Sequence, residues 1–212
     1  MGKSTGHDTE TEHRILDAAR NVFVKRGTAG ARMAEIAQEA GVNQALLHYY
    51  FRNKERLSQA VFAQVAARIV PALLNLGSDA SLDDKIERVV HAYIENLSAN
   101  PFIPGYLLSE LHHHPARVAQ LLESAIGAAP NLLMQPVFAR LAQQIAERVG
   151  AGDMRPIAPE QFAINLIALC IFPFAARPML TVVFGMDDEA FARFIEQRKT
   201  ELPAFFRNAL RP

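Results

Sequence analysis

The sequence contains a single cysteine, and its positive and negative side chains balance. Both facts limit the kinds of protein that this chain can be. One cysteine, Cys170, excludes a disulfide within the chain, and its place in an apolar run favours a small buried side chain over a redox sensor. Lys and Arg number 22, as do Asp and Glu, so the whole chain lacks a basic signature. Residues 1–60 hold nine Lys and Arg against seven Asp and Glu, which is only a small positive excess.

Signals for secretion or membrane insertion are also lacking. Residues 1–13 are polar and have no apolar core of a secretion signal, so we expect residues 1–10 to be disordered and the protein to be cytoplasmic. The longest apolar stretch, 162–184, is interrupted by an asparagine, an arginine and two prolines. This pattern favours a buried or interface helix over a membrane span.

No motif of catalytic chemistry stands out. Glycine-rich phosphate loops are absent, and no serine has a nucleophile-elbow context. Consecutive side chains such as His112, His113 and His114 point about 100° apart on a helix, so they cannot together bind one metal ion. A helix end before Pro115, where histidines complement terminal carbonyls, explains them better. We predict no enzyme activity, cofactor or metal; a helical metalloenzyme that uses this cluster is the weaker alternative.

Residues 32–57 carry the most specific pattern in the chain, that of a helix-turn-helix. Ala37 lies on the inner face of a short first helix, where a small side chain lets the second helix approach. Gly41 follows at the point where the chain must turn sharply, and a positive φ is easily adopted only by glycine. Leu47 and Tyr50 fall on the buried face of the second helix at helical spacing.

The exposed start of this second helix is the predicted DNA-reading surface. In a helix-turn-helix, this part enters the major groove and meets base edges and phosphates. Gln44 is the best candidate for reading a base, because its amide pairs with adenine through two hydrogen bonds. The predicted DNA contacts from this region are Arg32, Asn43, Gln44, Ala45, Leu46, His48 and Tyr49.

The flanking residues carry a family resemblance over 12–57. RILDAARNVF at 14–23 precedes the motif, EIAQEAGV lies within it at 35–42, and YFRNKERL follows at 50–57. In this order the segments resemble the DNA-binding domain of the tetracycline-repressor (TetR) family of bacterial transcription regulators. The resemblance implies that Lys54 contacts a phosphate. It also implies a second helical domain that binds an effector and forms a homodimer.

Three positions depart from the family pattern. Arg32 stands where the family usually has Ser or Thr, so the helix loses a hydroxyl cap, although the guanidinium can still clamp a phosphate. Leu46 and His48 replace a frequent Thr and Tyr. Leu46 can meet a thymine methyl or pack inward, and His48 can donate to a phosphate or a guanine. These departures keep open the alternative that the chain retains the fold, binds a ligand or partner, and does not read DNA.

Beyond the motif, the pattern is helix after helix, with no alternating strand pattern. Helices are expected over about 54–70, from Ser81 to Asn100, over 102–113, from near Pro115, over 131–149, from Pro159 to Pro173 or Pro178, and from Asp187 toward Pro203. We therefore predict an all-α fold with two domains: a three-helix DNA-binding domain at 1–57 and a helical effector-binding and dimerisation domain at 58–212.

An effector pocket is expected near the irregular segment PFIPGY at 101–106, where prolines and a glycine surround aromatic residues. The predicted lining is Phe62, Tyr93, Phe102, Tyr106, His112 and Phe174. Plain core packing explains any one of these residues equally well. The resemblance also implies a dimer interface built from two late helices of each subunit. Helix 131–149 and the segment after Pro159 would supply it, with the final helix as a competing choice; the alternative is that these apolar faces belong wholly to the core of one chain.

Together these features predict a ligand-responsive transcription regulator. The specific hypothesis is a repressor that binds a near-palindromic operator as a homodimer and is released by a small apolar effector.

Overall fold

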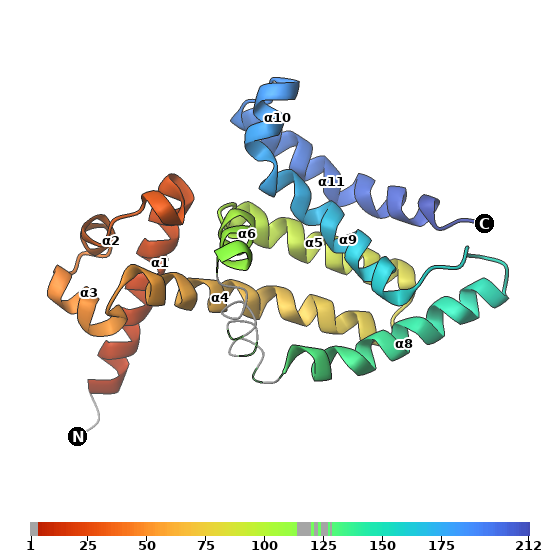
Figure 1. Ribbon diagram of the computed structural model, residues 1–212, viewed down its shortest axis with the longest axis horizontal. Coiled ribbons are helices and arrows are strands. Elements are labelled where there is room, and N and C mark those ends of the chain that lie inside the picture. The colour runs from red at the N-terminus through yellow and green to blue at the C-terminus, as the bar shows by residue number, and fades with distance from the viewer. Residues whose placement is uncertain (1–3, 114–119, 121–122, 124–126, 128) are drawn as a thin grey trace. The chain divides into compact units, whose positions relative to one another are not determined.

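The computed structural model describes residues 4–113, 120, 123, 127 and 129–212, and all regular elements in these residues are helical (Figure 1). The predicted all-α fold is confirmed. The chain divides into two compact units, one of residues 1–66 with 100–125 and one of 67–99 with 126–212. The predicted domain boundary at 57/58 falls inside one helix, α4 (Lys54–Leu74), which both units share. The helix expected near Pro115, and His114, lie outside the described residues.

The first unit contains the helix-turn-helix. Its described helices are α1 (Ser4–Gly30), α2 (Met33–Glu39), α3 (Gln44–Phe51), the first part of α4, and α6 (Ile103–His113). Ile15, Phe23, Ile36, Leu47 and Leu57 are fully buried and form one apolar cluster. This cluster fixes α2 and α3 against α1.

The start of α1 lies in the segment for which disorder was expected. Residues 1–10 were expected to be disordered, and the described part of α1 begins at Ser4. Tyr50 of α3 donates a hydrogen bond of 2.9 Å from its hydroxyl to Asp8, and Thr11 is buried. These contacts with the helix-turn-helix give the polar segment partners that its composition alone does not reveal.

The turn between α2 and α3 is held by backbone geometry and by one arginine. Gly41 adopts φ 64°, as its place in the motif predicts. The amide of Val42 donates to the carbonyl of Ala37 at 3.0 Å. Arg14 of α1 donates from Nη2 to the carbonyl of Ala40 at 2.9 Å, so the end of α2 is tied to α1.

The second unit is a helical bundle built around α5. Its elements, besides the end of α4, are η1 (Asn75–Gly77), α5 (Leu82–Ala99), α8 (Pro130–Gly150), α9 (Pro159–Ala175), α10 (Arg177–Phe184) and α11 (Asp188–Ala209). Helix α5 packs against α9 and α11, while α8 packs against η1 and α9. In Figure 1, α5, α9 and α11 lie side by side in this unit. The predicted caps are confirmed, since Ser81 and Asp187 each accept a backbone hydrogen bond at the start of a helix.

Two helix ends differ from expectation. The segment after Pro159 forms two helices, α9 and α10, bent by 67° at their junction. The ring of Pro178 suits the first turn of α10, where its missing N–H costs nothing, so the chain starts a new helix there. The final helix continues through Pro203 to Ala209, because Leu202, Pro203 and Phe206 are buried on one face. Packing of that face outweighs the backbone hydrogen bond that a proline removes.

Apolar composition alone would let parts of this chain span a membrane. The segment Lys54–Gly77 is long and apolar enough to do so, as is the bent α9–α10 pair taken as one span. Core helices of water-soluble proteins meet the same criterion.

A buried lysine joins three elements of the second unit. Lys85 of α5 is fully buried, and its Nζ donates to the carbonyl of Leu76 in η1 at 2.7 Å and to the side chain of Gln144 in α8. Gln144 in turn donates to the carbonyl of Ala80 at 3.1 Å. Burial lowers the pKa of Lys85 from its ordinary value. The network satisfies polar groups that would otherwise be buried without partners.

We predict that Gly41→Ala destabilises the first unit by about 1–2 kcal/mol, because an L side chain is strained in the left-handed region. Gly105→Ala in α6 is the matched control, since a Cβ there meets no atom within 4 Å and φ is not positive. The control should be neutral or stabilising by up to about 1 kcal/mol. Urea unfolding of both variants measures the difference, and equal effects would contradict the left-handed requirement at residue 41.

Candidate nucleic-acid interface

The start of α3 presents a continuous exposed surface. Asn43 caps the helix, its Oδ1 accepting a 2.7 Å hydrogen bond from the amide of Leu46. Leu47 and Phe51 are buried in the core beneath. The side chains left exposed include Gln44, Ala45, His48 and Tyr49, with Tyr49 78% exposed. No residue of the core covers these side chains, so they can contact another molecule.

One ring nitrogen of His48 contacts a backbone carbonyl, which leaves the other ring nitrogen for another partner. Its Nδ1 lies 2.8 Å from the carbonyl oxygen of Arg52, which cannot donate, so Nδ1 carries the proton. In the neutral ring, Nε2 is then an acceptor. Arg52, which follows α3, has φ 23° and is the only non-glycine residue of the described chain with a positive φ. The hydrogen bond to His48 helps to hold this unfavourable backbone conformation.

Arg32 lies beside a second surface feature of the first unit. It is the N-cap residue of α2 and makes no side-chain cap hydrogen bond, as the sequence predicted, and it is exposed. Together with Arg26 and Gln38, it lines a hollow of about 490 Å³ next to α2. Arg26 is paired with Glu35 at 3.3 Å. Arg26 and Gln38 were not predicted from the sequence, because only the fold brings the end of α1 beside α2.

Lys54 has a structural role that the sequence did not reveal. Its Nζ donates to the carbonyls of Ala29 at 3.0 Å and Ala31 at 3.1 Å, where α1 ends. One of its three N–H groups remains for another acceptor. Lys54 therefore ties the start of α4 to the segment that carries Arg32, and its predicted phosphate contact stays a prediction. Asn53 caps α4 as expected, accepting from the amide of Arg56 at 2.9 Å.

The predicted effector-pocket residues fall into separate groups. In the first unit, the rings of Phe62 and Tyr106 lie 6.1 Å apart, and His112 is exposed on α6. Phe102 packs against the apolar cluster of this unit, its ring 5.7 Å from that of Phe23. It belongs to the core of the DNA-binding unit, a long-range contact that local sequence does not show.

The remaining two predicted pocket residues lie in the second unit. Tyr93 is buried, which raises its pKa, and Phe174 stacks edge-on against Phe191 at 5.8 Å. Cys170 is buried as expected, and burial raises the pKa of its thiol to about 12, so it stays protonated at neutral pH. The hollow beside α2 is lined by none of the six predicted residues.

Among the described residues, no group of three or more His, Cys, Asp or Glu side chains is arranged to bind one metal ion.

A short second helix of a helix-turn-helix with a free outer face is the arrangement of a DNA-reading module. Residues 15–61 match the family model of "Bacterial regulatory proteins, tetR family". The chain is 31% identical over 185 residues to the HTH-type transcriptional repressor NicS of Pseudomonas putida, a match that covers 84% of this chain and 82% of NicS. The chain therefore belongs to the tetR family of bacterial transcription regulators, which agrees with the prediction that it is not an enzyme.

Other similarities are weaker or confined to part of the chain. A match with the regulator SrpR of Pseudomonas putida has 34% identity over 93 residues, which is 44% of this chain and 42% of SrpR. The crystal structure of HlyIIR, a hemolysin II transcriptional regulator, matches with a TM-score of 0.58 at 22% identity, over 97% of this chain and 99% of that one. At this identity the structural match supports the fold.

We predict that Lys54→Ala lowers the free energy of unfolding by about 1–3 kcal/mol, because two carbonyls lose a charged hydrogen-bond donor. Arg32→Ala should change it by less than about 0.5 kcal/mol, since its side chain is exposed. Denaturant unfolding of the two variants compares them. If Lys54→Ala lowered the free energy of unfolding no more than Arg32→Ala does, the structural role assigned to Lys54 would be contradicted.

Proposed function

We propose that this protein is a cytoplasmic, ligand-responsive repressor that binds a near-palindromic DNA operator as a homodimer. A small apolar effector releases it. The observation that supports DNA reading most directly is the exposed, Asn43-capped start of α3, with Gln44 and His48 free on its outer face.

The chemistry of this face suits base and phosphate contacts. The amide of Gln44 offers a donor and an acceptor for adenine, and Nε2 of His48 offers an acceptor in the neutral ring or a donor when protonated. Arg32 supplies an exposed guanidinium for a phosphate at the start of α2. Each phosphate contact makes binding more sensitive to salt.

A second copy of the chain is the proposed cover for an apolar surface on α9 and α10. Its large apolar side chains are at least 46% exposed: Ile164, Phe172, Met179, Val182, Val183 and Phe184. Arg177 fixes the start of α10 by pairing with Asp188 at 2.8 Å and by lying 4.7 Å from the ring centre of Phe191. On α8 the exposed large apolar residue is Leu132. The distribution favours α9 and α10 over α8 as the main interface.

Release from DNA requires only a small coupling free energy between effector binding and DNA binding. A coupling free energy of about 1–3 kcal/mol between effector and DNA changes affinity by about 5- to 150-fold. In a dimer, a small change in the spacing of the two α3 helices is enough, because both must enter successive major grooves of one duplex.

We predict that the double change Gln44→Ala with His48→Ala weakens specific DNA binding by about tenfold or more, since each good base contact contributes about 1–3 kcal/mol. The measurement is a gel shift with the DNA that flanks the protein's own gene. Arg32→Ala should reduce the slope of log affinity against log salt concentration by about one, which is the contribution of one phosphate contact.

The matched control for that experiment is His91→Ala with Gln197→Ala, which removes the same residue types from exposed sites on α5 and α11. This control should bind as the unchanged protein does. Absence of a specific shift with this DNA, and then with a library of genomic fragments, would reject the repressor. It would favour a protein that keeps the fold and binds a ligand or partner without reading DNA.

We predict that Val182→Glu converts the dimer to a monomer, because Val182 is 84% exposed and a charge there cannot be buried in an apolar interface. Leu132→Glu on α8, which is 62% exposed, is the control and should leave the dimer intact. Light scattering after size-exclusion chromatography gives both masses. A monomer from Leu132→Glu alone would place the interface on α8 instead.

A further inference from the structure

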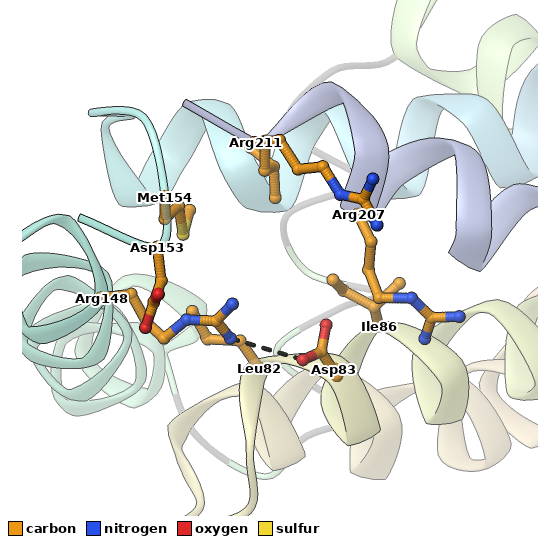
Figure 2. Close-up of a pocket in the computed structure, with 9 residues that line it drawn as sticks. Leu82, Asp83, Ile86, Arg148, Asp153, Met154, Arg207 and Arg211 are labelled. Carbon is orange, nitrogen blue, oxygen red and sulfur yellow. Dashed lines mark hydrogen bonds and ion pairs between the residues drawn. The ribbon is translucent and has the colours of Figure 1, made fainter. Parts of the chain in front are cut away.

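A cavity of about 190 Å³ lies in the second unit, where the start of α5, the end of α8 and the end of α11 meet (Figure 2). None of the residues predicted from the sequence to line a pocket borders it. Pockets for drug-sized ligands are usually about 300–1,000 Å³. This cavity therefore suits a smaller molecule.

Arginines outnumber carboxylates among the residues that line the cavity. Arg148, Arg207 and Arg211 line it, beside Asp83 and Asp153. Arg207 is already paired with Glu87, so Arg148 and Arg211 are the arginines that remain for a carboxylate on a ligand.

Arg148 is only partly satisfied by its protein partner. Its Nη1 lies 3.4 Å from Asp83, whereas the neighbouring pair of Arg207 with Glu87 is closed to 2.8 Å. The Nε of Arg148 is buried and has no hydrogen-bond partner among the residues that the structure describes. A buried donor without a partner is unfavourable, and a ligand oxygen is the kind of group that satisfies it.

Arg211 provides a cation that has no ion-pair partner among the described residues. It is exposed, and its side chain makes no ion pair with any described residue. Figure 2 shows Arg148 on one side of the cavity and Arg207 and Arg211 on the other, with Leu82, Asp83 and Ile86 beneath.

The floor and wall of the cavity are apolar. Leu82, Ile86, Met154 and Leu210 border it, and each is at most 7% exposed. An inorganic ion would leave this surface in contact with water, whereas an organic group would cover it. The lining therefore suits a ligand in which an anionic group is attached to an apolar part.

We propose that this cavity binds a small organic monocarboxylate. Its carboxylate hydrogen-bonds to Arg148 and Arg211, and its apolar body packs against Leu82, Ile86 and Met154. The two aspartates disfavour a ligand with a second negative charge, since like charges repel. The binding does not depend on DNA recognition, so it stands or falls separately from the proposed function.

The test is titration calorimetry of the full chain with phenylacetate, its neutral amide phenylacetamide, its cationic counterpart phenethylamine, and acetate. Phenylacetate should bind at least about tenfold more tightly than each of the others, because only it combines the charge with the apolar body. Equal binding of the amide, tighter binding of the amine, or no binding of phenylacetate would overturn the proposal.

Variants locate the site. Arg148→Met and Arg211→Met should each weaken phenylacetate binding by about tenfold, the loss expected for one charge-assisted contact. Arg211 is exposed near the chain end, so its variant tests the site even if Arg148→Met fails to fold. The control is Arg193→Met, an exposed arginine of α11 outside the cavity, which should bind normally. Unchanged binding in Arg211→Met would contradict the proposed site, while a specific gel shift without phenylacetate binding would leave the proposed function intact.

Discussion

The placement of α3 depends on cations that bind the carbonyl groups at helix ends. The last carbonyls of a helix lack intrahelical partners and carry partial negative charge. Arg14 binds the carbonyl of Ala40 at the end of α2, and Lys54 binds those of Ala29 and Ala31 at the end of α1. Both cations come from distant parts of the chain. They hold the two connections that set the orientation of α2 and α3, and thus of the outer face of α3 that we propose reads DNA.

Features that depend on neighbouring residues were predicted correctly from the sequence, whereas contacts between residues far apart in the chain were not predicted. The caps at Asn53, Ser81 and Asp187 and the turn at Gly41 depend on a few neighbouring residues, and all were found as expected. The exposure of Gln44, Ala45, His48 and Tyr49 followed from helical spacing in the same way, whereas Leu46 is half-buried. By contrast, the partners of Lys54 are 23 and 25 residues away.

The second unit carries two chemically different surfaces near the two ends of α11. At its start, Asp188 pairs with Arg177 and fixes the apolar helix α10. At its end, Arg207 borders the arginine-lined cavity. A helix of 22 residues spans about 33 Å, so these surfaces do not touch each other. An influence of one on the other would have to travel through α11 or through α5, which packs along it.

The burial of Lys85 also makes it an internal reporter of motion. Its amine is enclosed by η1, α5 and α8, so an acylating reagent reaches it only when these elements separate. Exposed Lys25 reacts without any such opening. The rate at which Lys85 is labelled therefore measures how often this part of the bundle opens, in the same way that amide hydrogen exchange does for the backbone.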